Sequence, residues 1–177
     1  MNIRNSVRLA LLATTTVLGA GMAQNALALT QTSNLTVSAT INNVCAISTA
    51  SSVAFGVYDP VTANATTALQ TASGSLSVTC TSGATEPVIT LGVGSNPNGA
   101  GSAAAPQRQM VSAGNLLAYY LYQENTYTTV WGNTAGSGYA YTGTGTASTI
   151  TVYGSIPAGQ NVPAGSYADT VVATVTY

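Results

Sequence analysis

Apolar and polar side chains alternate strictly near the start of the chain, between residues 35 and 41. Successive side chains of an extended strand point to opposite faces, so this segment predicts an amphipathic strand. Residues 167–177 end in the same alternation. The apolar faces of the two predicted strands consist of Leu35, Val37, Ala39 and Ile41 in the first and of Val171, Ala173, Val175 and Tyr177 in the last.

The rest of the chain predicts short strands and no helix. Valine, threonine, isoleucine and tyrosine recur in short runs separated by glycine, proline, asparagine and serine, which is typical of strands and turns. Two stretches of small residues, 94–106 and 132–146, predict surface loops. About seven or eight short strands indicate one all-β sandwich domain. The further predicted strands are 44–47, 53–58, 75–80, 88–93, 116–123 and 149–153.

The N-terminus predicts an export signal. Two arginines precede an apolar run over residues 9–20, which is shorter than the roughly 20 residues that span a bilayer. Residues 26–28, Ala-Leu-Ala, form a small-x-small cleavage motif. We expect a signal peptide over residues 1–28 and a secreted mature chain from Leu29. An uncleaved membrane anchor is the alternative.

Removal of the signal peptide changes the charge of the chain. It leaves one base, Arg108, against four acids, and hence a net charge of −3. A chain without lysine or histidine cannot neutralise a phosphate backbone, so nucleic acid and anionic membranes are poor partners. The surface must consist mainly of threonine, serine, asparagine, glutamine and glycine, which suits an extracellular protein.

The two cysteines, Cys45 and Cys80, both lie in the exported part of the chain. An oxidising compartment favours their pairing, so we predict one disulfide. Two free thiols or a metal-binding pair are the alternatives. A metal has little support, because the chain has no histidine and no CxxC spacing. We expect no cofactor.

The last predicted strand raises the question of what covers it. Its alternation continues to Tyr177, so we expect no following strand, and an uncovered edge exposes main-chain groups beside a hydrophobic groove. The N-terminal strand of another molecule can fill such a groove. Because this contact does not close on itself, it extends into a fibre. The pattern leaves open that residues 35–41 complete their own sandwich.

The titratable side chains argue against catalysis. A Ser-His-Asp triad is impossible without histidine, and paired cysteines supply no thiolate. A pair of carboxylates can hydrolyse a glycoside. However, Asp59 precedes Pro60 in a predicted turn, and Asp169 follows Tyr167, so capping and hydrogen bonding are the simpler roles. We expect that the protein is not an enzyme.

Several short motifs together resemble the spore coat protein U domain family, which includes subunits of Csu-type archaic chaperone-usher pili. The resemblance covers nearly all of the mature chain and rests on the order and spacing of the motifs. They are the alternating strand 35–41 before Cys45, Phe55-Gly56-Val57-Tyr58-Asp59, Gly74-Ser75-Leu76-Ser77-Val78-Thr79-Cys80, Arg108-Gln109-Met110, Leu117-Ala118-Tyr119-Tyr120-Leu121-Tyr122, Trp131-Gly132, and Gly165-Ser166-Tyr167-Ala168-Asp169-Thr170 with the strand to Tyr177.

The resemblance implies an incomplete immunoglobulin-like β-sandwich over residues 43–177, which lacks its last strand. Residues 29–42 would contain a donor strand that completes the next subunit. The donor residues would be Leu35, Val37, Ala39 and Ile41, and the acceptor groove would be lined partly by Val171, Ala173, Val175 and Tyr177.

The resemblance also implies the partners of the chain. These are identical or related pilin subunits, a periplasmic chaperone and an outer-membrane usher, which build a cell-surface pilus for attachment and biofilm formation. We expect a shaft subunit, since adhesins of these systems carry a receptor-binding domain before the pilin domain. A spore coat or other extracellular coat protein of the same fold is the alternative.

The aromatic side chains permit a different hypothesis. Tyr119, Tyr120, Tyr122 and Trp131 would form a carbohydrate-stacking platform if this were a secreted binding module. Aromatic residues on alternate faces of a strand are more often part of the core and of the sheet surface. Tyr167 lies where a tyrosine corner would brace the last strand, or where an ordinary core tyrosine would pack.

Overall fold

The structure, a computed structural model, describes residues 28–97 and 100–177, so residues 1–27 of the predicted signal peptide lie outside the described residues. Strands make up nearly all of the regular structure in this part of the chain, which confirms the predicted all-β class. The elements are β1 (Cys45–Ser51), β2 (Leu69–Cys80), β3 (Val88–Leu91), β4 (Arg108–Ser112), β5 (Asn115–Tyr122), the 3-10 helix η1 (Ala135–Ser137), β6 (Tyr139–Ala140), β7 (Ser148–Ile156) and β8 (Ala173–Thr176).

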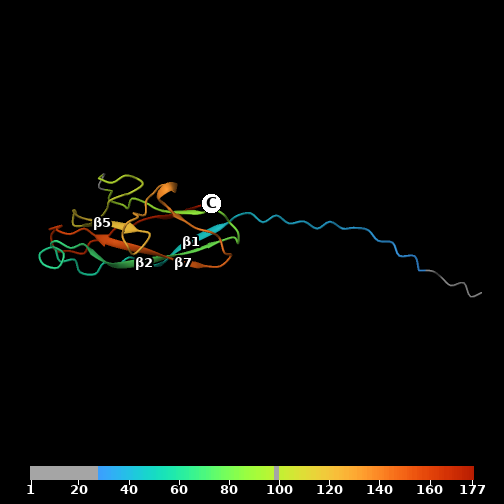
Figure 1. Cartoon of the computed structure of the whole chain (residues 1–177), viewed down its shortest axis with the longest axis horizontal. Helices are drawn as coiled ribbons and strands as arrows, with labels where there is room; N and C mark the ends of the chain where they lie inside the picture. The colour runs from blue at the N-terminus through green and yellow to red at the C-terminus, as the bar shows by residue number, and fades with distance from the viewer. Residues whose placement is uncertain (1–27, 98–99) are drawn as a thin grey trace, which may run out of the picture. The chain divides into compact units, whose positions relative to one another are not determined.

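The strands form two antiparallel sheets (Figure 1). The larger sheet has five strands in the order β1-β2-β7-β5-β4, and the smaller has three in the order β6-β3-β8. β1 and β8 are therefore edge strands. One buried cluster with members from both sheets forms the core, as in a β-sandwich. Its least exposed side chains are Val78, Cys80, Ala84, Ile89, Trp131 and Ile156.

Alternation along each strand decides which side chains reach the core. In β5, Leu117, Tyr119 and Leu121 are buried, whereas the residues between them are half-buried on the outer face of the sheet. In β7, Ile150 and Val152 are buried in the same way. The alternation of apolar and polar residues in the sequence thus matches the alternation of buried and half-buried side chains in these strands.

Six of the predicted strands correspond to β1, β2, β3, β5, β7 and β8, with different ends. β2 begins six residues before the predicted residue 75, and β8 covers only the end of the predicted segment 167–177. The sequence prediction missed β4, which begins with arginine and glutamine, and the two-residue β6. The described residues of the predicted loop 94–106 form neither helix nor strand, whereas η1 and β6 lie within the predicted loop 132–146.

The predicted strand over residues 53–58 is wrong. We name residues 52–58 the crossing segment, because the chain leaves β1 there and passes over the inner face of the larger sheet. A Cβ on Gly74 of β2 would lie 2.8 Å from the Val53 nitrogen, and a Cβ on Gly154 of β7 would lie 2.7 Å from the Phe55 ring. These glycines make room for the segment. Between residues 53 and 57 its main chain forms no hydrogen bond within the described residues, so no strand forms.

The buried guanidinium of Arg108, on β4, bridges the two sheets. Nε donates to the Gly92 carbonyl at 2.7 Å, and Nη2 donates to the carbonyls of Leu91 and Trp131 at 2.9 and 2.8 Å. Leu91 ends β3, so these bonds join the larger sheet to the smaller one. Burial lowers the pKa of Arg108 to about 10, so the side chain remains charged at neutral pH. The carbonyls take the place of water around Nε and Nη2, whereas Nη1 is buried without a hydrogen-bond partner among the described residues.

Replacing Arg108 by alanine should lower the free energy of unfolding by about 3 kcal/mol or more, because carbonyls lose a charged donor and a cavity opens. Urea unfolding followed by the fluorescence of Trp131, the single tryptophan, measures this loss. Gln109→Ala is the matched control on the same strand and should change the free energy by less than about 0.5 kcal/mol. Equal stability of Arg108→Ala and the native chain would contradict the bridging role.

Candidate functional site

An open groove runs between the crossing segment and the last part of the chain. One part, of about 430 Å³, lies between residues 49–55 and 167–173. The other part, of about 850 Å³, continues between residues 53–61 and 161–167. Both parts share the side chains of Val53, Phe55, Met110 and Tyr167. We treat them as one continuous groove and name it the edge groove.

The floor of the edge groove is the hydrophobic core itself. Leu76, Leu121 and Val152 reach it from the larger sheet, and Leu91 reaches it from the smaller one. None of these four side chains is more than 6% exposed. The groove is therefore an opening between the two sheets, at a place where a further strand would complete the sandwich.

The wall formed by the last strand carries residues of the predicted acceptor groove. Val171, Ala173 and Val175 are half-buried and pack against the core, whereas Val172 between them is 67% exposed. Val171 and Ala173 line the edge groove. Val175 lies outside this lining, and Tyr177 is 57% exposed.

The strand β8 is paired on one side only within the described residues. Its partner is β3, and the Gly92 N–H donates to the Val172 carbonyl at 2.8 Å just before β8 begins. Main-chain groups of successive residues in an antiparallel strand point to opposite sides. Because Val172 faces β3, the main-chain groups of Val171 and Ala173 point toward the edge groove. An added strand would find hydrogen-bonding positions there beside apolar pockets.

The carboxylate of Asp169 fixes the start of this wall. Oδ1 accepts hydrogen bonds from the N–H groups of Ser95 and Thr170, both at 2.8 Å. The Tyr119 hydroxyl donates to Oδ2 at 2.7 Å. Burial, together with this hydrogen bond, raises the pKa of Tyr119 above its usual range. Asp169 therefore acts as a structural acceptor that joins a loop, the core and the last strand.

Two tyrosines hold the ends of the groove walls. The Tyr167 hydroxyl donates to the Pro163 carbonyl, four residues upstream, at 2.8 Å, which confirms the predicted tyrosine corner. The Tyr58 hydroxyl donates to the Pro157 carbonyl at 2.8 Å and accepts from the Gln160 N–H at 3.0 Å. The crossing segment is thereby tied to the loop that follows β7.

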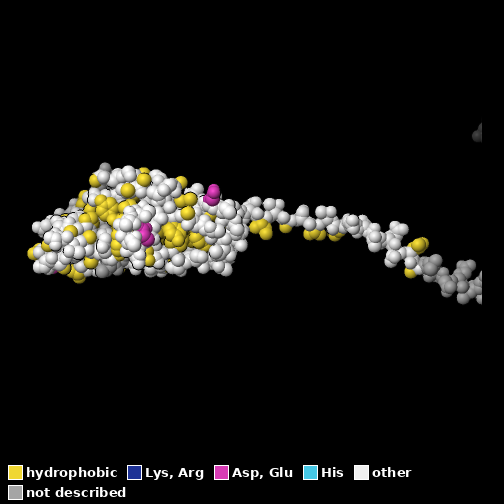
Figure 2. Space-filling view, in the orientation of Figure 1, with side chains coloured by type: hydrophobic (Ala, Val, Ile, Leu, Met, Phe, Trp, Pro, Cys, Tyr) yellow, Lys and Arg dark blue, Asp and Glu magenta, His cyan; other side chains and the backbone are white. Residues whose placement is uncertain are grey.

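Residues 29–42, which we name the N-terminal arm, contain the predicted donor strand. The arm forms neither helix nor strand in the single chain, so the strand predicted over residues 35–41 is absent there. Its apolar side chains are open to solvent, with Leu35, Val37 and Ile41 exposed by 88, 85 and 84% (Figure 2). Ala39 is exposed as well. Burial of the apolar face of such a segment against a partner lowers the free energy of the system.

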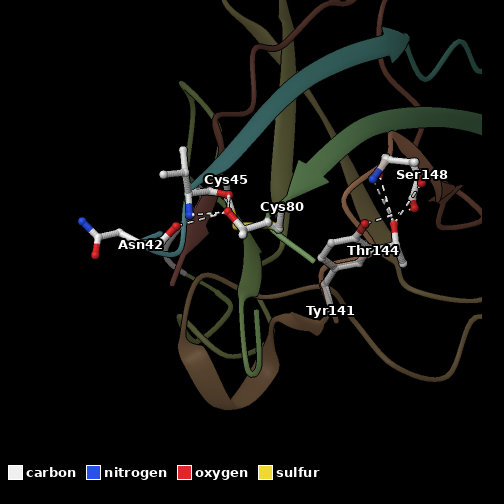
Figure 3. The surroundings of a disulfide bond; sticks show 9 residues. Asn42, Cys45, Cys80, Tyr141, Thr144 and Ser148 are labelled. Atoms are coloured by element: carbon white, nitrogen blue, oxygen red, sulfur yellow. Dashed lines mark hydrogen bonds between the residues drawn. A yellow bond between two sulfur atoms is a disulfide. The ribbon is translucent and has the colours of Figure 1, made fainter. Parts of the chain in front are cut away.

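The predicted disulfide fixes the point where the arm ends. Cys45, the first residue of β1, and Cys80, the last residue of β2, form a disulfide (Figure 3). The two residues are also directly opposite each other in the pairing of these strands. The N–H of Thr81 donates to the Val44 carbonyl at 2.9 Å, and the Val44 N–H donates to Oγ1 of Thr81 at 3.0 Å. The chain therefore enters β1 from a covalently anchored position.

Two further carboxylates, those of Asp59 and Glu124, also serve local structure. Oδ1 of Asp59 accepts from the N–H groups of Val61 and Thr62, and the Thr62 hydroxyl and N–H lower the pKa of Asp59 to about 2. Oε1 of Glu124 accepts from the Thr128 N–H at 2.9 Å. No group of three or more histidine, cysteine, aspartate or glutamate side chains that could hold a metal ion occurs among the described residues.

The fold separates the members of the predicted aromatic platform. Tyr119 is 4% exposed and Trp131 is fully buried, with its Nε1 donating to the Ile89 carbonyl at 2.7 Å. These two rings are core residues and are inaccessible to a carbohydrate. Tyr120 and Tyr122 lie on the outer face of β5 and remain partly accessible.

The second wall of the edge groove was not predicted from the sequence. Val53 and Phe55 line the groove, although their alternation predicted an ordinary strand. Val57 and Val61 border its larger part and are 89 and 75% exposed. The sequence does contain one signal for this wall. Gly74 lies at an inward-facing position of β2, and a glycine inside a strand often marks the close approach of another segment.

Comparisons with known proteins identify a matching family, a relative and a solved structure. A family model for the Spore Coat Protein U domain matches residues 31–174. Protein U of Myxococcus xanthus is 41% identical over 179 residues, which cover 98% of this chain and 99% of that protein. The crystal structure of the CsuC-CsuE chaperone-tip adhesion subunit pre-assembly complex, from archaic chaperone-usher Csu pili of Acinetobacter baumannii, matches with a TM-score of 0.49 and 24% identity. That match covers 78% of this chain and 40% of the other.

Within the described residues, no helix has the length and apolar character needed to cross a membrane. Figure 2 shows few charged side chains on the face of the molecule that it draws. Several of the most exposed apolar side chains belong to the N-terminal arm, and the edge groove adds an apolar lining.

The turn that begins at Asp59 should make stability depend on acid pH. The folded chain lowers the pKa of Asp59 to about 2, so its contribution is complete above the ordinary aspartate pKa of about 4 and is lost as the pH falls toward about 2. Asp59→Asn should therefore be less stable than the native chain at pH 7, with the difference shrinking below about pH 4. Urea unfolding at several pH values tests this, and a difference independent of pH would contradict it.

The disulfide should stabilise the domain strongly. The two cysteines are separated by 35 positions, and closing such a loop contributes about 4 kcal/mol on the chain-entropy model. The double variant Cys45→Ser, Cys80→Ser should lose this amount in urea unfolding. Alkylation followed by mass spectrometry should label neither cysteine of the native chain until a reductant is added. Labelling without reductant would disprove the bond.

Proposed function

Since this chain belongs to the Spore Coat Protein U domain family, we propose that it is a structural subunit of an extracellular fibre. The N-terminal arm of each molecule fills the edge groove of the next. One observation carries the proposal: a sandwich with an open groove floored by its own core occurs in a chain whose alternating arm is exposed. The proposed parts are a signal peptide (1–28), the arm (29–42) and the domain (43–177).

The apolar side chains of the arm supply the driving force. Leu35, Val37 and Ile41 are each more than 80% exposed, and burying such a side chain contributes roughly 1.5–3 kcal/mol. Ala39 occupies the remaining position on the same face. The edge groove offers apolar lining from both walls, including Val53, Phe55, Val171 and Ala173. Several such contacts together suffice for a stable junction.

The main chain of the arm supplies register and further affinity. An arm strand beside β8 would hydrogen-bond to the main-chain groups that point into the groove at Val171 and Ala173. On its other side lies the crossing segment, whose main chain has no partner between residues 53 and 57 within the described chain. In β-strand addition, main-chain hydrogen bonds give affinity and alternate side chains give specificity.

We infer that the fibre is a pilus of the chaperone-usher type. An open hydrophobic groove is an aggregation hazard before assembly, so a periplasmic chaperone would cover it and an outer-membrane usher would deliver the subunit to the growing fibre. Identical or related subunits are the permanent partners. Surface attachment and biofilm formation would be properties of the assembled pilus.

An extracellular coat is the second candidate. It is favoured by the extent of the match to Protein U of Myxococcus xanthus, which spans nearly the whole of both chains. A coat would use the same junction between arm and groove, so the two candidates differ in the assembly and not in the subunit. The carboxylates of Asp59, Glu124 and Asp169 each hold their own surroundings in place, which favours a structural role for these three side chains.

A charge on the inward face of the arm should block assembly. Val37→Asp should abolish fibres, because an ionised carboxylate cannot enter an apolar groove without a large desolvation cost. Ser38→Asp is the matched control, since its side chain lies on the opposite face of the same strand and should leave assembly intact. Electron microscopy of cells that carry each variant provides the measurement. Fibres of normal length from Val37→Asp would refute the assignment of the arm.

Complementation between two variants identifies both halves of the junction. Val37→Asp keeps an intact groove, and Val171→Asp keeps an intact arm, so each alone should remain monomeric while their mixture forms dimers in size-exclusion chromatography. Val172→Asp, on the exposed face, is the control for the groove. A peptide of residues 29–42 should also raise the melting temperature of Val37→Asp, and the same peptide carrying the charge should not. Absence of both dimers and stabilisation would refute the groove assignment.

A further inference from the structure

A group of tyrosines covers part of the outer face of the larger sheet, on the side away from the edge groove. Tyr120 and Tyr122 belong to β5 and Tyr153 belongs to β7. Tyr122 and Tyr153 face each other in the register of the two strands. Because the neighbouring residues Leu121 and Val152 point into the core and line the groove, these tyrosines point outward. We name them, with Tyr127, the tyrosine face.

The rings of the tyrosine face form a connected row. The centroids of Tyr120 and Tyr122 are 6.2 Å apart, those of Tyr122 and Tyr127 are 5.4 Å apart, and those of Tyr127 and Tyr153 are 6.3 Å apart. All four side chains are half-buried, so each ring is supported by protein and partly open to solvent. A row of this kind is a rigid surface, since tyrosine loses little conformational entropy when it binds a ligand.

The chain places Tyr127 at some conformational cost. Tyr127 lies in the loop after β5 with a φ of +55°, which an aromatic residue seldom adopts. Its hydroxyl donates to the Gln70 carbonyl of β2. Oε1 of Glu124 accepts from the N–H groups of Thr128 and Thr129 and so holds the loop. Unfavourable backbone conformations of this kind concentrate at functional sites.

The chemistry around the tyrosine face is neutral and polar. The hydroxyls of Tyr122 and Tyr153 form no hydrogen bond within the described residues, so they are free to bind a ligand. Glu124 is engaged by its loop, and Arg108 is buried. The face thus offers ring surfaces and hydroxyl groups to a ligand. Within the described part of the chain, it has no cationic side chain that would attract an anionic one.

We propose that the tyrosine face binds a neutral polysaccharide. The apolar faces of sugar rings pack on aromatic rings, and sugar hydroxyls hydrogen-bond to tyrosine hydroxyls, so one ligand uses both properties of the face. A polyanion would lack a cationic partner. Tyr127 meets Tyr122 and Tyr153 edge-to-face, with interplanar angles of 81° and 79°, so the row offers several differently oriented contact points. Such a surface suits an extended chain of sugars better than a single sugar.

The tyrosine face does not depend on the proposed fibre, because it lies on the side of the sheet opposite the groove. If the subunits assemble as proposed, the fibre presents many copies of the face, and simultaneous contacts along one polysaccharide chain strengthen weak binding through effective concentration. Assembly variants of the arm should therefore bind polysaccharide as monomers, which separates a failure of this proposal from a failure of the proposed function.

Affinity electrophoresis of the mature chain in native gels tests the proposal. The gels contain soluble xyloglucan, galactomannan or dextran as neutral probes, or alginate as a polyanion. At least one neutral probe should retard the native chain and Val37→Asp. Tyr122→Ala and Tyr153→Ala should each weaken the retardation roughly two- to tenfold, as expected for the loss of one aromatic contact. Tyr122→Phe and Tyr153→Phe should weaken the retardation less than the alanine variants, because the rings remain and only the hydroxyl hydrogen bonds are lost.

Tyr141→Ala is the matched control, since Tyr141 is a half-buried tyrosine outside the face whose hydroxyl donates to Ser148. The proposal is overturned if no neutral probe retards the native chain, if only alginate does, or if Tyr141→Ala weakens binding as much as the face variants. It is also overturned if the face variants lose only self-association, which would make a second copy of the chain the partner. If the alanine variants do not fold, nitration of the native chain replaces them as the test. A bound neutral probe should then protect Tyr122 and Tyr153 from nitration, as measured by mass spectrometry, and absence of this protection would overturn the proposal.

Discussion

The buried guanidinium of Arg108 is the contact on which the open architecture depends. A complete sandwich is held closed on all sides by paired strands, whereas here one side is open along the edge groove. The bonds from Arg108 to the carbonyls of Leu91, Gly92 and Trp131 join the sheets where no strand pairing does so. Because charge-assisted hydrogen bonds are the stronger ones, this side chain is a firm link between the two sheets, beside the core that both sheets share.

The groove and the arm are made from the same sequence pattern. Residues 35–41 and 171–177 both place an apolar side chain at every second position, and neither segment alone buries that face completely. In the proposed junction each supplies what the other lacks, since a strand needs both main-chain partners and an apolar surface to pack on. Asp169, Tyr119 and the tyrosine corner at Tyr167 hold the groove wall in place, so little of it would need to reorder when an arm enters.

Features that depend on the alternation of apolar and polar residues, or on the spacing of motifs, could be predicted from the sequence. The all-β class, the disulfide and most strands were predicted because each leaves a local signature, whereas the tyrosine corner at Tyr167 was one of two alternatives. Prediction from the sequence failed where long-range geometry decides. Residues 53–58 alternate like a strand, but their course over Gly74 and Gly154 leaves the main chain without a partner. The burial of Arg108 was also unpredictable, because an arginine is ordinarily exposed and its carbonyl partners lie far away in sequence.

The division of the aromatic residues shows why the two surfaces can serve different purposes. Along β5 the period of two sends Tyr119 inward to Asp169 at the groove wall and sends Tyr120 and Tyr122 outward to the tyrosine face. One strand therefore contributes to the groove on one side of the sheet and to the proposed ligand surface on the other. Since the two sets of side chains never share a face, substitutions in one can leave the other intact. A subunit built in this way can join a fibre and still present an unaltered outer surface.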